Sequence, residues 1–86
     1  MTYKVEYKSS VSKDLKKLNT RSAERILHQV EKDLGADPDR GVPLSAQFKG
    51  LFKYRIGDYR IIYAKTKDGI LVLRIGHRSK VYRVSR

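Results

Sequence analysis

The spacing of apolar residues changes twice along this chain, and that change limits the possible folds more than any other feature. Residues 2–7 alternate apolar and polar side chains, which is the period of a half-buried strand. Residues 11–34 follow the helical period instead, and alternation returns after Gly50. A strand, a helical region and further strands within 86 residues predict one α+β domain that spans residues 1–86.

Two amphipathic helices are predicted in the helical region. The first places apolar residues at i, i+4 and i+7 from Val11, with Asp14 and several lysines on its other face. Asn19 or Thr20 can cap the second helix, and Gly35 stands where a helix commonly ends. The two helices are therefore expected to form a hairpin.

Three strands are predicted after the helical hairpin, each rich in alternating, aromatic or β-branched residues: 51–56, 59–64 and 70–75. Gly57-Asp58 and Asp68-Gly69 supply the hairpin turns between them. Residues 36–50 contain two prolines and two glycines, so they are expected to form a loop without regular structure. The predicted order is β-α-α-β-β-β, with the helical hairpin on one face of a mainly antiparallel four-stranded sheet.

Positive charge is concentrated in the second half of the chain. Residues 41–86 hold eleven of the 20 basic residues but only two acidic ones, Asp58 and Asp68, so they carry +9 of the net charge of +11. A surface adapted only for solubility would mix the two signs. The uneven distribution therefore favours a polyanionic partner.

The sequence offers no metal-ligand pattern and no segment for a membrane. It contains no cysteine, and its two histidines lack the spacing of a zinc site. No run of about 18 apolar residues is present, and the N-terminus lacks a secretory signal. We therefore expect a cytoplasmic protein without a metal or other cofactor and without a membrane partner.

A two-residue turn at Gly57-Asp58 would fix the register of the two strands around it. Arg55 would then lie opposite Arg60, with Lys53 on the same face, while the aromatic residues of the hairpin face the helices. Like charges placed directly opposite each other destabilise a sheet by roughly 0.2–1 kcal/mol. An anionic ligand explains the cluster better than a structural role does, although the long side chains could also spread into water.

The register of the last strand is open between two turn lengths. An even-length turn places Leu73 and Ile75 on the face of Arg60, and His77 with them where the strand extends that far, whereas an odd-length turn places Arg74 there. We favour the odd length, because it places the apolar residues of the strand under the helices: Leu71, Leu73 and Ile75.

Such a basic cluster could hold RNA or cleave it. Cleavage by attack of a ribose 2′-OH needs a base, positive charge near the phosphate and an acid for the leaving 5′ oxygen. Arginines supply the charge, and neighbouring cations disfavour the charged form of a lysine, so Lys53 is a candidate base. His77 and Tyr82 are further groups that could exchange a proton. Arg78 and Tyr82 lie beyond the last strand, where they could close over the open face.

Three segments together resemble the RelE/ParE toxin superfamily of prokaryotic type II toxin–antitoxin systems: YKVEYKSSVSKDLKKL at residues 3–18, YRIGDYRIIY at 54–63 and IGHRSKVYR at 75–83. The resemblance extends over nearly the whole chain. It implies the RelE-like fold, which agrees with the order of strands and helices derived from the apolar periodicity.

The resemblance implies one of two activities. RelE-type toxins cut mRNA in the ribosomal A site and leave a 2′,3′-cyclic phosphate and a 5′-OH, whereas ParE-type toxins lack the basic catalytic set and inhibit DNA gyrase. A toxin-like fold that only binds RNA or a partner is a third alternative. We expect a ribosome-dependent mRNA endoribonuclease, because this sequence has every residue type of the basic catalytic set of RelE toxins.

The resemblance implies a set of catalytic residues: Lys53, Arg55, Arg60, Arg78 and Tyr82, with His77 as a possible acid. The RelE pattern usually has lysine where Arg55 stands, and arginine is a poor proton acceptor, so the identity of the base stays open. Further basic residues are expected to contact RNA: Lys49, Arg74, Lys80 and Arg83.

The resemblance also implies partners. They are a cognate acidic antitoxin of the RelB type, the ribosomal A site with its mRNA, and operator DNA reached only through the antitoxin complex. A basic toxin favours an acidic antitoxin electrostatically. Covering the open face or displacing the C-terminal segment would block the entry of RNA.

Overall fold

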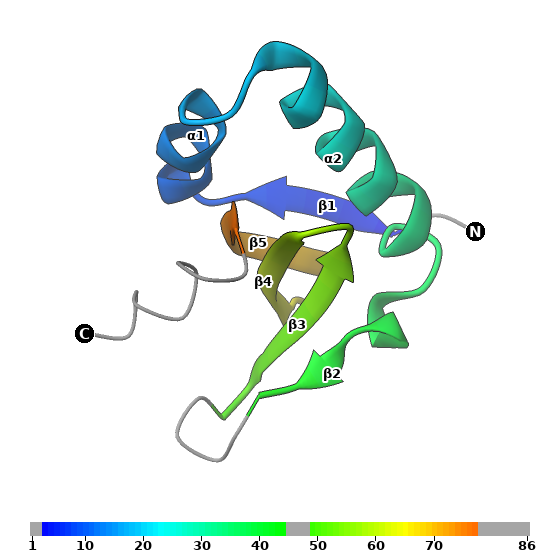
Figure 1. Ribbon diagram of the computed structural model, residues 1–86. Coiled ribbons are helices and arrows are strands. Elements are labelled where there is room, and N and C mark those ends of the chain that lie inside the picture. Colours follow the sequence, from blue (N-terminus) through cyan, green and yellow to red (C-terminus); the bar gives the residue numbers. More distant parts are fainter. Residues whose placement is uncertain (1–2, 45–48, 78–86) are drawn as a thin grey trace.

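The computed structural model describes residues 3–44 and 49–77, which form two helices packed on a sheet (Figure 1). Along the chain the elements are β1 (Lys4–Tyr7), α1 (Ser9–Lys16), α2 (Thr20–Asp33), a 3₁₀ helix η1 (Pro38–Arg40), β2 (Val42–Pro43), β3 (Leu51–Ile56), β4 (Tyr59–Lys65) and β5 (Gly69–His77). The predicted α+β class is confirmed. No helix in the described part of the chain is long and apolar enough to cross a membrane.

The sheet has five strands in the order β1-β5-β4-β3-β2, with β1 parallel to β5 and the other neighbours antiparallel. The four-stranded prediction missed β2, which pairs Val42 with Lys53 and Pro43 with Phe52. A two-residue strand has no alternation to detect, and proline, which lacks an N–H, is tolerated at such an edge. The segment 36–50, predicted to be a loop, therefore also holds η1 and a short edge strand.

The helices cover one face of the sheet, and the core lies between the two layers. Val11 of α1 and Ile26 and Val30 of α2 are at most 2% exposed. From the sheet, the core takes buried side chains of β4 and β5: Ile61, Tyr63, Ile70, Val72 and Ile75. Since α1 and α2 both lie on the side of these residues, neither of them covers the opposite face of the sheet (Figure 1).

The register of β3 and β4 is the predicted one. Arg55 lies opposite Arg60, and Gly57 and Asp58 form the turn between the strands. Gly57 has a φ of +60°, a left-handed conformation that glycine adopts without steric cost. This short turn therefore determines which side chains of the hairpin face the helices and which face away.

The end of β5 has the register of the odd-length turn. Arg74 lies opposite Ile62, and Ile75 lies opposite Ile61. Ile75 is therefore on the helix-covered face, and Arg74 is on the opposite one, as predicted. His77 lies opposite Tyr59, so its position belongs to the helix-covered face.

A bulge earlier in β5 makes the rest of that prediction wrong. Val72 lies opposite Tyr63, and Leu73 has no partner among the residues of β4. The bulge displaces the alternation by one residue, so Ile70 and Val72 are buried under the helices while Leu71 and Leu73 are only partly buried. The strand is almost wholly apolar, and such a run gives no sign of where an extra residue is inserted.

The hydroxyl of Tyr63 fixes the segment that leads into β2. It donates a hydrogen bond to the carbonyl oxygen of Pro38 at 2.8 Å and accepts one from the N–H of Gly41 at 2.9 Å. The side chain is fully buried, its ring stacks on that of Phe52, and burial raises the pKa of Tyr63. One buried tyrosine thus holds η1 and β2 against the sheet.

Replacing Tyr63 with phenylalanine is expected to lower the free energy of unfolding by about 1–3 kcal/mol, because the N–H of Gly41 loses its acceptor. Denaturant unfolding monitored by circular dichroism measures this loss. The control is Tyr3→Phe, at a side chain that is 48% exposed, for which we expect a change within about 0.5 kcal/mol. Equal unfolding midpoints for both variants would contradict the role of the buried hydroxyl.

Candidate functional site

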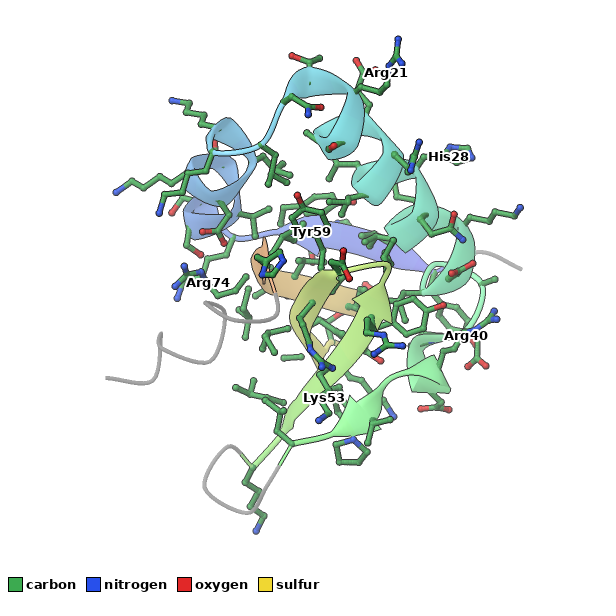
Figure 2. All side chains as sticks on the ribbon, viewed as in Figure 1. Arg21, His28, Arg40, Lys53, Tyr59 and Arg74 are labelled. Atoms are coloured by element: carbon green, nitrogen blue, oxygen red, sulfur yellow. The ribbon has the colours of Figure 1, made fainter. Side chains whose placement is uncertain are left out.

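Three basic side chains share the sheet face opposite the core, and we call them the basic face: Lys53 and Arg55 of β3 and Arg60 of β4. Arg55 and Arg60 are direct cross-strand partners, and Lys53 lies two residues from Arg55 on the same side of β3. Lys53 is well away from the helical layer (Figure 2). The three basic residues therefore share one face of the sheet, as the two-residue turn predicts.

The basic face is arranged in two cross-strand rows. In the first row Ile62 stands between Lys53 and Arg74, and its side chain is 5% exposed. In the second row Arg60 stands between Arg55 and Gly76, which contributes no side chain. Lys53, beside the row of Arg55 and Arg60, forms with them a surface on which an extended polyanion can lie.

Acidic side chains contribute little to this surface. By register, β3, β4 and β5 place no carboxylate on it. The edge strand β1 adds Glu6, whose carboxylate is 3.8 Å from the ammonium group of Lys4. The electrostatic character of the sheet face is therefore positive around Lys53, Arg55 and Arg60.

The position of β3 is anchored from the opposite face by Tyr54. Its hydroxyl donates a 2.6 Å hydrogen bond to Asp33 of α2, which also accepts one from Gln29 at 2.9 Å. These two hydrogen bonds, that of Gln29 first, lower the pKa of Asp33, while burial raises the pKa of Tyr54. Because Tyr54 stands between Lys53 and Arg55 in the chain, this contact holds both basic residues in place.

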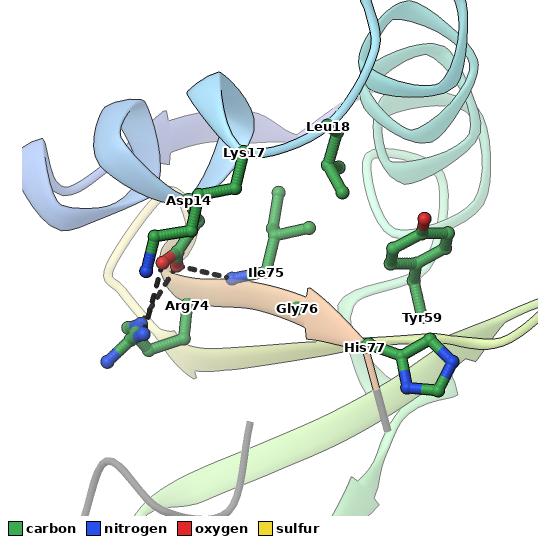
Figure 3. Close-up of a pocket in the computed structure, with 8 residues that line it drawn as sticks. All are labelled: Asp14, Lys17, Leu18, Tyr59, Arg74, Ile75, Gly76 and His77. Atoms are coloured by element: carbon green, nitrogen blue, oxygen red, sulfur yellow. Dashed lines mark hydrogen bonds and ion pairs between the residues drawn. The ribbon is translucent and has the colours of Figure 1, made fainter. Parts of the chain in front are cut away.

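Arg74 is engaged by a carboxylate that the sequence prediction misplaced. Asp14 was predicted to lie on the polar face of α1, but it is only 6% exposed. Its oxygens accept from Arg74 Nε at 2.8 Å and Nη2 at 3.0 Å, and from the backbone N–H of Ile75 at 3.0 Å (Figure 3). The available signal was its position, since residue 14 lies one turn after Val11 on the apolar side of the helix.

A small cavity of about 160 Å³ opens beside this ion pair, between the end of α1 and the end of β5 (Figure 3). Tyr59 and His77 line it, with their rings edge to face and 6.0 Å between centroids. Lys17, the residue after α1, lines the cavity on the side of Asp14. His77 is therefore near Arg74 but on the other face of the sheet from Arg60.

The remaining predicted site residues are only partly within the described chain. Lys49 is exposed and lies two residues before β3. The other four lie outside the described residues: Arg78, Lys80, Tyr82 and Arg83. Over residues 3–44 and 49–77, no group of three or more His, Cys, Asp or Glu side chains is placed to hold a metal ion.

Comparisons with known proteins agree with the fold and with the resemblance seen in the sequence. The family model for the ParE toxin of the type II toxin–antitoxin system parDE matches residues 5–82. The toxin RelG of Mycobacterium tuberculosis is 33% identical over 86 residues, which cover 96% of this chain and 99% of the relative.

Two solved complexes have the same fold. The toxin–antitoxin complex RelBE2 from Mycobacterium tuberculosis contains a chain with a TM-score of 0.83 and 30% identity, covering 93% of this chain and 95% of that one. The archaeal RelE–RelB complex from Pyrococcus horikoshii gives a TM-score of 0.68 and 27% identity, covering 94% and 100%. The fold predicted from the resemblance, RelE-like, is thereby confirmed. This chain belongs to the RelE/ParE family of toxins of type II toxin–antitoxin systems.

Proposed function

We propose that this toxin is an endoribonuclease that cuts mRNA in the ribosomal A site. The observation that carries the proposal is the direct pairing of Arg55 with Arg60, beside Lys53, on a sheet face that neither α1 nor α2 covers. Opposed arginines weaken a sheet unless an anion lies between them. A phosphate of the RNA backbone is such an anion, and arginine binds it with paired donors.

The proposed reaction needs no metal ion. A base removes the proton of the 2′-OH, the 2′ oxygen attacks the adjacent phosphorus, and the bond from phosphorus to the 5′ oxygen breaks as that oxygen receives a proton. The products are a 2′,3′-cyclic phosphate and a 5′-OH. The extra negative charge that develops on the phosphate oxygens is the part that fixed cations can stabilise.

Each residue has a proposed role in this reaction. Arg60 and Arg78 stabilise the developing charge, Lys53 accepts the proton with Arg55 beside it, and Tyr82 orients the nucleotide. His77 is a weaker candidate for the acid, because its register places it on the other face from Arg60. Further RNA contacts are proposed for four basic residues: Lys49, Arg74, Lys80 and Arg83.

We also propose a cognate acidic antitoxin of the RelB type as the neutralising partner. Both solved relatives described above are toxin–antitoxin complexes, and the net charge of +11 favours an acidic protein. The antitoxin would act by covering the basic face or displacing the C-terminal segment, in the cytoplasm of a prokaryote. Operator DNA would be bound by the complex through the antitoxin.

The test is cleavage of a defined mRNA by the purified toxin. With ribosomes stalled at a known codon, we expect cuts within the A-site codon, mapped by primer extension, and 5′-OH ends on the downstream fragments. The same mRNA without ribosomes, and programmed ribosomes given toxin with its antitoxin, are the controls and should stay intact. An uncut message on programmed ribosomes would refute the proposal.

A second candidate function is inhibition of DNA gyrase, because the matching family model is that of the ParE toxin. A gyrase supercoiling assay separates the two. Loss of supercoiling at toxin concentrations that leave programmed ribosomes and their mRNA intact would favour this candidate over the endoribonuclease.

A further inference from the structure

Asp14 is the buried charged residue among those that the structure describes, and the hydrogen bonds of its carboxylate go to Arg74 and Ile75 of β5. One oxygen accepts from Arg74 Nε and from the N–H of Ile75, and the other accepts from Arg74 Nη2. A carboxylate that binds a guanidinium side-on with two parallel hydrogen bonds holds it in a fixed orientation. The third hydrogen bond holds the backbone of the same strand.

These contacts replace a missing strand. β1 ends at Tyr7, which lies opposite Val72, so the outer edge of β5 loses its partner strand there. The beginning of α1 takes over, as Ser10 Oγ donates to the carbonyl oxygen of Leu73 at 2.7 Å. Asp14, one turn further along α1, then accepts from the N–H of Ile75 at 3.0 Å. α1 thus continues the edge pairing of β5 with side-chain groups, and Figure 3 shows the contact of Asp14.

The part of β5 held in this way lies next to the basic face in the sheet. Arg74 shares a row with Lys53, and Gly76 is the cross-strand neighbour of Arg60. Arg78, a proposed catalytic residue, follows His77 directly in the sequence. A displacement of the end of β5 by about 1 Å would therefore change the distance between groups that act on one phosphate, which can slow an enzyme about 10²-fold.

We propose that Asp14 is a positioning residue of the nuclease site, which holds Arg74 and the end of β5 in the geometry that cleavage requires. This inference rests on the proposed function. Asp14 itself does not touch the RNA. Its effect passes through Arg74 and the backbone of Ile75, so it should appear in the rate of the chemical step and not in the affinity for ribosomes.

The experiment measures single-turnover cleavage as a function of the concentration of programmed ribosomes. The maximal rate, written kcat below, reports the cleavage step, and the ribosome concentration that gives half of this rate, written KM below, reports binding. We expect Asp14→Asn, which preserves size and loses the charge, to lower kcat about 10- to 100-fold with KM within about threefold. Arg74→Ala should lower kcat similarly, and Arg74→Lys should recover part of the loss. The double variant of Asp14→Asn and Arg74→Ala should have a kcat no lower than the slower single variant, because both changes disrupt one unit.

Glu24→Gln is the matched control, since it removes a carboxylate charge from an exposed position of α2 and leaves every contact between α1 and β5 intact. It should cleave at the unchanged rate. All variants are compared below their melting temperatures, which are measured first. A kcat of Asp14→Asn equal to that of the unchanged chain, or losses that multiply in the double variant, would overturn the positioning role alone. Failure of the unchanged chain to cut would instead overturn the proposed function, and the positioning role with it.

Discussion

Replacing Arg60 with alanine is expected to lower the rate of mRNA cleavage on the ribosome by about 10²- to 10³-fold. Arg60 is the central residue of its row, between Arg55 and Gly76, so its charge is nearest to a phosphate lying across the basic face. Removing a cation that stabilises charge formed during the reaction slows the chemical step much more than it weakens binding of the substrate. Single-turnover cleavage at saturating ribosome concentration measures this effect.

Two control variants make the result specific. Arg21→Ala removes the same charge from the exposed start of α2, remote from the basic face, and should cleave within about twofold of the unchanged chain (Figure 2). Arg60→Lys keeps the charge but loses the paired donors, so an intermediate rate is expected. Antitoxin binding by Arg60→Ala should persist, since many other contacts can hold that partner. Equal losses for Arg21→Ala and Arg60→Ala would show that net charge, and not a phosphate site, governs the rate.

The part of this site that could be predicted from sequence is the part governed by local rules. The opposition of Arg55 and Arg60 follows from a two-residue turn containing Gly57 and from the strict alternation of side chains in a strand. Both rules act over fewer than ten residues of chain. The positions of Lys53, Arg55 and Arg60 on one face therefore required no knowledge of the tertiary structure.

The features that could not be predicted depend on contacts between distant segments. Asp14 is buried because Arg74 and Ile75, 60 and 61 residues further along the chain, satisfy its carboxylate. The charge of Asp14 predicts a position on the polar face of its helix, whereas its spacing from Val11 places it on the apolar side, where it is buried. The bulge at Leu73 and the two-residue strand β2 depend in the same way on neighbouring strands. The approach of Arg78 and Tyr82 to the basic face stays a prediction.

Lys53→Arg is expected to lower the cleavage rate by about 10²- to 10⁴-fold, although it keeps the positive charge. An amine can accept the proton of the 2′-OH once it is deprotonated, whereas a guanidinium stays protonated at any pH that the protein tolerates. If Lys53 is the base, then Lys53→Arg should be nearly as slow as Lys53→Ala. If it only contacts phosphate, Lys53→Arg should cleave at close to the unchanged rate.

Arg55→Lys distinguishes the two ways in which this site could obtain a base. Residues 53 and 55 face the same side of β3, so a lysine at position 55 places a second amine next to Arg60. Combined with Lys53→Arg, it exchanges the two groups while the charge of the basic face stays the same. We expect Arg55→Lys to restore at least about tenfold of the rate lost in Lys53→Arg, measured by single-turnover cleavage. A double variant as slow as Lys53→Arg alone would show that the amine must stand at residue 53, and full activity of Lys53→Arg would leave Tyr82 as the proton acceptor.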